Sequence, residues 1–197
     1  DSPKTKKIKK DFINNEFINI IKINKGVKSI DPEAFRGCIK LEEIYIPEGV
    51  KSIGNSMFRG CANLIKISLP ETVTTIGEHA LRGAHKLGHI TIPSKVTLLE
   101  GSVFRGCFNL VEIKMADSKL TVFKKSTFRG CTKLKELTIP NTVTLIEKSS
   151  CEKCSTITEI VIPKSVNQIE NQAFRGCSSL AKITVDPYTT TIENDAF

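Results

Sequence analysis

Residues 33–54 read EAFRGCIKLEEIYIPEGVKSIG, and residues 56–77 repeat the pattern as SMFRGCANLIKISLPETVTTIG. The same pattern returns further along the chain, anchored on Leu81, Phe104, Phe128, Cys151 and Phe174. The step is 23 residues every time, except for 24 between Phe104 and Phe128, where KMADSKLTVF (114–123) also lacks the usual proline. Self-similarity at a fixed period of this size is typical of stacked repeats rather than of one irregular core.

The apolar positions within one period read L-x-x-I-x-I-P-x-x-V-x-x-I-G-x-x-A-F-x-G-C. The I-x-I piece alternates with period two and predicts a short strand with its isoleucines inward, which the following proline ends. The V-x-x-I piece has three-residue spacing and predicts a tight turn or a short 3-10 segment. One such unit cannot bury its own apolar side, but stacked units can. We therefore predict a right-handed α/β repeat solenoid of 23-residue coils, with one parallel β-sheet on its concave side and short 3-10 or irregular turns on its convex side.

The periodic region fills nearly the whole chain and predicts a single domain over 1–197. It divides into a partial repeat at 1–15, seven full repeats over 16–177 and a partial repeat at 178–197. Terminal repeats normally carry a polar cap, yet the last residue, Phe197, is apolar and lies in mid-repeat. We expect either that the chain is a fragment of a longer array or that this open coil allows end-to-end or edge association with a partner.

Composition excludes several classes of protein. The chain has a net charge of +8, which favours acidic partners, and no apolar run of about 18 residues that would span a membrane. It contains no G-x-S-x-G motif, no phosphate-binding glycine loop and no Ser/His/Asp group, so no enzyme and no cofactor are predicted. Specific nucleic-acid binding is not predicted either, because few aromatic side chains are available to stack on bases.

The order of strand, proline, I-G, A-F and terminal Cys or Asn in 23-residue units resembles the BspA-like (Treponema pallidum-type) class of leucine-rich repeats. The resemblance runs from Phe12 to Phe197 and departs from the pattern at Ala84, at MADSKL (115–120) and at SSCEKC (149–154). It implies a curved leucine-rich-repeat solenoid in a protein exposed on a cell surface or secreted. It further implies adhesion or binding to host proteins, and it carries no catalytic motif.

A solenoid turns each repeat position into a column of residues about 4.8 Å apart. The cysteine column consists of Asn15, Cys38, Cys61, Ala84, Cys107, Cys131, Cys154 and Cys177. Because Asn15 and Ala84 also fill this slot, we expect buried free thiols rather than disulfides or a metal site. Cys151 of the CEKC stretch occupies a phenylalanine slot and is expected in the core. His79, His85 and His89 are expected on different sides of the coil, without a metal.

The arginine column consists of Arg36, Arg59, Arg82, Arg105, Arg129 and Arg175, interrupted by Glu152. Like charges stacked this closely repel by about 1 kcal/mol per pair in water, so something should offset them. The column is either an inherited surface feature with solvated heads or a cationic stripe for an anionic glycan, such as a sulfated or acidic polysaccharide. If it is a stripe, Glu152→Arg should strengthen glycan binding.

The outward residues of the predicted sheet form the other candidate site, because the concave wall is the usual binding surface of a solenoid. They are Glu43, Tyr45, Lys66, Ser68, His89, Thr91, Glu112, Lys114, Glu136 and Thr138. Two hypotheses follow. The first is a non-enzymatic interaction or adhesion protein that binds a host or extracellular protein through this face, and the alternative is an anionic-glycan binder that uses the arginine column. Steep weakening by salt would favour the glycan.

Overall fold

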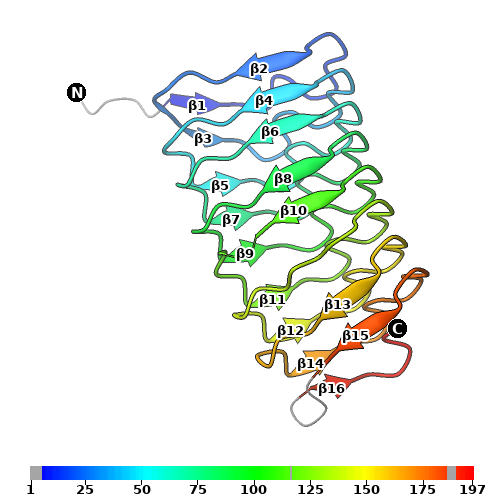
Figure 1. Ribbon diagram of the computed structural model, residues 1–197. Coiled ribbons are helices and arrows are strands. Elements are labelled where there is room, and N and C mark those ends of the chain that lie inside the picture. The colour runs from blue at the N-terminus through cyan, green and yellow to red at the C-terminus, as the bar shows by residue number, and fades with distance from the viewer. Residues whose placement is uncertain (1–5, 116, 186–189) are drawn as a thin grey trace.

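A computed structural model describes residues 6–115, 117–185 and 190–197 of the chain. Residues 1–5 of the predicted N-terminal partial repeat, Ala116 in the irregular MADSKL stretch and residues 186–189 of the predicted C-terminal partial repeat lie outside the described residues. The coils stack into an elongated β-solenoid, with one strand track in front and a second behind it (Figure 1). The solenoid prediction is therefore confirmed.

The first strand track comes from the I-x-I pieces. Its strands are β2 (Ile20–Lys22), β4 (Glu43–Tyr45), β6 (Lys66–Ser68), β8 (His89–Thr91), β10 (Glu112–Lys114), β13 (Glu159–Val161) and β15 (Lys182–Thr184). They pair in parallel with a shift of one repeat, so that Ile44 lies opposite Ile67. The middle residue is buried in β4, β6, β8, β10 and β13, with Ile44 and Ile160 almost fully buried, whereas Ile183 of the terminal β15 is exposed. The alternation of the sequence therefore places the flanking residues on the outside.

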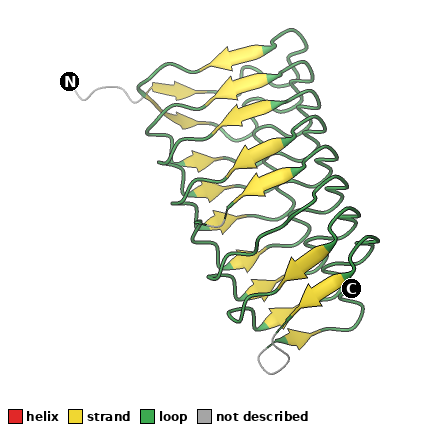
Figure 2. Ribbon diagram, viewed as in Figure 1, coloured by secondary structure: helices red, strands yellow, loops and turns green. Residues whose placement is uncertain are grey.

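The second strand track was not predicted. It consists of β1 (Lys6–Ile8), β3 (Val27–Ile30), β5 (Ser52–Ile53), β7 (Thr75–Ile76), β9 (Leu98–Leu99), β11 (Val122–Phe123), β12 (Leu145–Ile146), β14 (Gln168–Ile169) and β16 (Thr191–Ile192). The three-residue spacing of V-x-x-I had suggested a turn, but its last two residues pair in parallel with the same residues of the next coil. The prediction of one sheet was therefore wrong, because two opposed strand tracks enclose the core (Figure 2).

The described residues contain no helix, so the α/β class and the 3-10 alternative are not confirmed, and the turns between the tracks are irregular (Figure 2). The wide turn that carries F-R-G-C explains why. Within this turn, Arg36 N–H donates to the Glu33 carbonyl and Cys38 N–H donates to the Phe35 carbonyl. Gly37 N–H, in contrast, donates to the Arg59 carbonyl of the next coil. Glu33 and Gly37 have φ of 64° and 71°. These left-handed residues interrupt any run of helical dihedrals and send alternate amides to the neighbouring coil.

The core is built from columns of identical slots. The rings of Phe35 and Phe58 stack at 5.5 Å between centroids, and those of Phe104 and Phe128 at 5.7 Å. Offset stacking of this kind adds to the free energy gained from burying the rings. Each coil therefore supplies one layer of a continuous apolar interior, and no coil buries its apolar side without a neighbour.

Both strand ladders are interrupted at the 24-residue repeat. Among the described residues, β10 has no paired strand in the following coil, and β9 does not pair with β11. The extra residue lies between β10 and β11, whereas the wide turns still bond across the same two coils, as Gly106 N–H does to the Arg129 carbonyl at 2.9 Å. The first track has a second gap in the described chain, between β6 and β8. The front surface is therefore divided into three sheets.

Candidate binding surfaces

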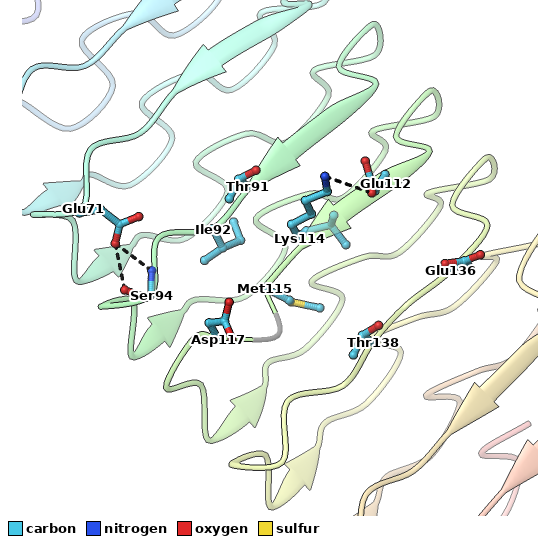
Figure 3. Close-up of a pocket in the computed structure, with 11 residues that line it drawn as sticks. Glu71, Thr91, Ile92, Ser94, Glu112, Lys114, Met115, Asp117, Glu136 and Thr138 are labelled. Atoms are coloured by element: carbon cyan, nitrogen blue, oxygen red, sulfur yellow. Dashed lines mark hydrogen bonds and ion pairs between the residues drawn. The ribbon is translucent and has the colours of Figure 1, made fainter.

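The strand face is the outer side of the first strand track. All ten residues predicted for the concave site lie on it: Glu43 and Tyr45 are half-buried, while Lys66, Ser68, His89, Thr91, Glu112, Lys114, Glu136 and Thr138 are exposed. Glu136 and Thr138 belong to the coil that lacks an assigned strand, yet they keep the same outward position (Figure 3). The repeat thus brings together residues up to 95 positions apart in the sequence.

Tyr45 is the centre of a small polar and aromatic cluster on this face. Its hydroxyl donates to Oε2 of Glu43 at 2.5 Å. Lys66 Nζ lies 5.1 Å from the centroid of the Tyr45 ring and Lys22 Nζ lies 6.0 Å from it. Two cations and a carboxylate therefore hold the ring in one orientation, and a ring fixed in this way loses little entropy when a partner packs on it.

Polar side chains pair along the rest of the face. Nδ1 of His89 lies 3.3 Å from a Glu112 carboxylate oxygen, and Nζ of Lys114 lies 3.6 Å from the other oxygen. Lys182 pairs with Glu159 at 2.6 Å. These pairs are solvent-exposed, so each contributes little stability and is available to exchange partners.

Three hollows open on the strand face, and they coincide with the interruptions of the ladder. One of about 340 Å³ spans β6 and β8, and one of about 460 Å³ lies between residues 135–141 and β13. The third, of about 370 Å³, runs from β8 across β10 to Glu136 and Thr138, with Ile92 and Met115 at its base (Figure 3). Glu71 at its rim accepts hydrogen bonds from the amide and hydroxyl of Ser94. Coils that lack ladder hydrogen bonds leave room between them for side chains of a partner.

The arginine column runs along the wide turns that join the second track to the first. The structure divides it by pairing. Arg36 lies 2.8 Å from Glu33, and Arg129 lies 3.1 Å from Glu152. Within the described part of the chain, Arg59, Arg82, Arg105 and Arg175 form no ion pair. The column is therefore not one uniform stripe.

Glu152 has a different role from the one expected. Its side chain is only 7% exposed and its carboxylate bonds to Arg129 of the preceding coil. Glu152 is thus a buried ion-pair partner and not a simple break in a solvated stripe. An arginine at this position would place a second cation against Arg129, so Glu152→Arg is no clean test of the column.

Arg59, Arg82 and Arg105 lie around the side chain of His79. Partial burial lowers the pKa of His79, the neighbouring Glu78 raises it, and the three arginines lower it further. Burial also lowers the pKa of Arg82, with smaller contributions from Arg105 and Arg59. Nδ1 of His79 is buried without a hydrogen-bond partner among the described atoms. No carboxylate of the described residues pairs directly with these three arginines, although Glu78 lies 3.7 Å from Nε2 of His79.

The cysteines form a structural column, as predicted. All seven are free and buried. The Sγ–H groups of the six cysteines in the column donate to the backbone carbonyl of the phenylalanine slot one coil earlier, for example Cys61 to Phe35 at 3.1 Å and Cys154 to Phe128 at 3.2 Å. Burial raises the pKa of the Cys107 thiol to about 12. Such thiols are poor nucleophiles and poor metal ligands.

The other candidate chemistry of the sequence is also structural. Cys151 is fully buried in its phenylalanine slot, as predicted. The three histidines are separated: His89 lies on the strand face, His79 among the arginines, and His85 stacks on Phe108 with ring centroids 4.9 Å apart. No group of His, Cys, Asp or Glu in the described chain is arranged to hold a metal ion. The described residues also contain no helix that could cross a membrane.

The His85–Phe108 pair was missed at the sequence level. Both residues follow the cysteine slot directly, in a column that also contains Ile39 and Ala62. Phe108 is 47% exposed, and its ring lies over the backbone of Gly106 and Gly130. The expectation of almost no exposed aromatic side chains was therefore too strict, since Phe17 is exposed as well. A scan of every outward column for aromatic residues would have found the pair.

Sequence comparison identifies the repeat. A model of the BspA type leucine rich repeat region, with six copies, matches residues 6–131 and 112–197. No curated protein gives a sequence match to the chain.

Solved structures share the architecture. A leucine-rich repeat protein from Bacteroides ovatus is 29% identical, with a TM-score of 0.71 over 89% of this chain and 51% of that protein. The T. pallidum leucine-rich repeat protein is 26% identical, with a TM-score of 0.69 over 84% of this chain and 73% of that protein. A leucine-rich repeat protein from Eubacterium ventriosum, 22% identical over 91% of this chain and 58% of its own, has the same fold with a TM-score of 0.75. The chain thus spans about half the length of the Bacteroides ovatus protein.

Proposed function

The chain belongs to the BspA-type leucine-rich repeat family, and from that membership and the form of its strand face we propose that it is a non-enzymatic interaction protein. It binds a host or extracellular protein through the strand face and acts in adhesion at a cell surface or after secretion. Proteins of this repeat family are commonly surface proteins that mediate protein interactions, which supports the proposal.

The observation that carries the proposal is the series of hollows along the strand face. A flat, fully paired sheet offers a partner only its side-chain tips, whereas three hollows of about 340 to 460 Å³ can receive side chains of a partner. Burial of side chains in such pockets generates most of the binding energy at protein interfaces. Tyr45 supplies an ordered aromatic residue near one end of the row.

The surrounding charges suit a protein partner of mixed charge. Glu112, Lys114 and Glu136 line the central hollow, and Lys66 lines the neighbouring hollow together with Glu112. Rim charges of both signs favour one orientation of the partner more than they add affinity. We therefore expect moderate affinity, with the contribution spread over several coils.

Arginine substitutions on opposite sides of the same coils test the proposal. Thr91→Arg with Thr138→Arg obstructs the hollows, and Thr97→Arg with Thr144→Arg adds the same charge beside the second track, where both threonines are exposed. Binding to an array of purified extracellular proteins should fall at least tenfold for the first pair, the equivalent of about 1.4 kcal/mol. Equal binding by both pairs would remove the strand face as the site.

The second candidate function is binding of an anionic glycan through the arginine column. The specific observation in its favour is that Arg59, Arg82 and Arg105 have no acidic partner among the described residues, although they lie close together. The dependence of binding affinity on salt concentration distinguishes the two functions. Exposed charge–charge contacts weaken steeply as ionic strength rises, whereas packed interfaces do not.

A further inference from the structure

We propose that Arg59, Arg82 and Arg105, together with the stacked rings of His85 and Phe108, form a subsite for a sulfated or carboxylated sugar chain. The arginines bind the acidic groups and the rings pack against the apolar face of a sugar. This inference rests on the second candidate function, and it narrows that function from the whole arginine column to three coils and one aromatic platform.

The first argument is the unequal pairing within the column. Arg36 and Arg129, which flank the three residues, each bond to a carboxylate at 2.8 and 3.1 Å. The three between them are half-buried and form no ion pair among the described residues, although Glu78 lies 3.7 Å from the neighbouring His79. Clustered cations repel, and partial burial strengthens the repulsion. An anion bound from solution is what would relieve it.

The geometry of the backbone makes the three arginines a straight row. Gly60 N–H donates to the Arg82 carbonyl at 2.9 Å, and Gly83 N–H donates to the Arg105 carbonyl at 3.0 Å. Successive arginines are therefore fixed one coil apart, at about the 4.8 Å spacing of paired strands. The guanidinium fork bonds sulfate or carboxylate through two N–H groups, and a row of forks fits an extended chain that carries such groups repeatedly.

The aromatic platform adjoins this row. Phe108 stacks on His85 at 4.9 Å, and a Cβ added at Gly106 would lie 3.8 Å from the Phe108 ring. Gly106 directly follows Arg105 in the chain, so the exposed ring lies beside the backbone that carries the last arginine of the row. Phe108 is 47% exposed, so part of the residue is open to a partner. An aromatic face next to fixed cations can contact both the apolar and the charged parts of an acidic sugar.

The platform also favours a glycan over a single-stranded nucleic acid. Nucleic-acid binders stack successive bases on successive aromatic side chains. In the column that contains His85 and Phe108, the neighbouring positions are Ala62 on one side and Thr132 and Ser155 on the other. The platform of His85 and Phe108 can therefore stack on one ring of a ligand, whereas the row of arginines extends over three coils.

The test measures the affinity of the whole chain for heparin, a sulfated glycan, in the parent and in three variants. The triple variant Arg59→Gln, Arg82→Gln, Arg105→Gln removes the row. The control Arg36→Gln, Lys51→Gln, Arg175→Gln removes the same charge elsewhere. A third form replaces the three arginines of the row with lysine, which keeps the charge and loses the fork. Equal unfolding midpoints by circular dichroism verify that all forms are folded.

We expect the glutamine triple variant to bind heparin on the order of a hundredfold more weakly than the parent, because charge-assisted hydrogen bonds are lost. The control should lose less than about tenfold, and the lysine form should lie between them. Phe108→Ser should weaken heparin binding without changing the weak binding of inorganic sulfate.

Each contrary result has its own meaning. No heparin binding by the parent would overturn both the subsite and the second candidate function. Equal losses by the triple variant and the control would overturn the subsite and leave the column as a diffuse cationic surface. Tighter binding of oligo(dT) than of heparin, lost in Phe108→Ser, would overturn the glycan assignment in favour of nucleic acid. None of these outcomes bears on the proposed binding of extracellular proteins through the strand face.

Discussion

Glu152 holds its carboxylate 3.1 Å from the guanidinium of Arg129, one coil away, while its own side chain is 7% exposed. The pair crosses the boundary between two coils, so it contributes to their stacking. Glu152→Gln should lower the free energy of unfolding by roughly 1–2 kcal/mol, because a charged hydrogen bond at a buried position is weakened. The measurement is the urea midpoint at neutral pH.

The matched control for this change is Glu159→Gln. Glu159 pairs with Lys182 at 2.6 Å, across two neighbouring coils, but both side chains are about half exposed or more. Its loss should cost less than about 1 kcal/mol. An equal loss of unfolding free energy in the two variants would contradict the claim that the buried ion pair contributes more than the exposed one.

The buried thiols predict how stability depends on pH. Burial raises the pKa of Cys107 to about 12 and that of Cys177 to about 11, against an ordinary value of 9.0. Above pH 9 the unfolded chain loses protons that the folded chain keeps. The stability from the protonated thiols is therefore complete below pH 9 and is lost as pH rises towards 11 and 12. The urea midpoint should fall steadily above pH 9.

Cys107→Ala tests the origin of that fall, because Ala84 already fills the same slot one coil earlier. The variant should show a shallower decline between pH 9 and 11 than the parent. At pH 8, all seven thiols of the folded parent should react with iodoacetamide only after unfolding. Rapid labelling of the folded protein, or an unchanged slope in the variant, would contradict the account.

The interrupted ladder predicts uneven hydrogen exchange. Among the described residues, no backbone hydrogen bond joins residues 136–139 to a neighbouring coil, whereas residues 43–46 are bonded to the next coil at several points. Amides without such bonds open at lower free energy. Peptides that cover 135–139 should therefore exchange before those that cover 43–46, as measured by mass spectrometry. Equal protection would mean that the ladder is continuous.

The repeat made the columns predictable, because an inward or outward slot is the same in every coil. It placed Ile44, Phe58 and Cys61 in the core, and it placed Glu112 and Lys114 on one outer face. The second track escaped prediction because a two-residue strand such as β5 is too short to display period two. Its existence depends on hydrogen bonds to the next coil, which no local pattern reveals.

Contacts between coils were the other part that could not be predicted. The pairing of Arg129 with Glu152 joins residues 23 positions apart, and it forms only when stacking sets their slots side by side. The extra residue in KMADSKLTVF was visible in the sequence, but the hollow beside it depends on how the next coil shifts. Arg36 forms an ion pair because Glu33 lies three residues before it, whereas Arg59 has Ser56 at that position and forms no ion pair among the described residues.

The most direct test of the strand face as the protein-binding surface is site-specific photo-crosslinking. A photoreactive benzophenone amino acid replaces Thr91 or Thr138 on the strand face, or Thr97 or Thr144 beside the second track, in otherwise identical chains. After irradiation with the extracellular protein selected by the array, cross-links should form from the two strand-face positions and not from the other two. Cross-links from Thr97 and Thr144 alone, or equally from all four, would contradict the proposed function.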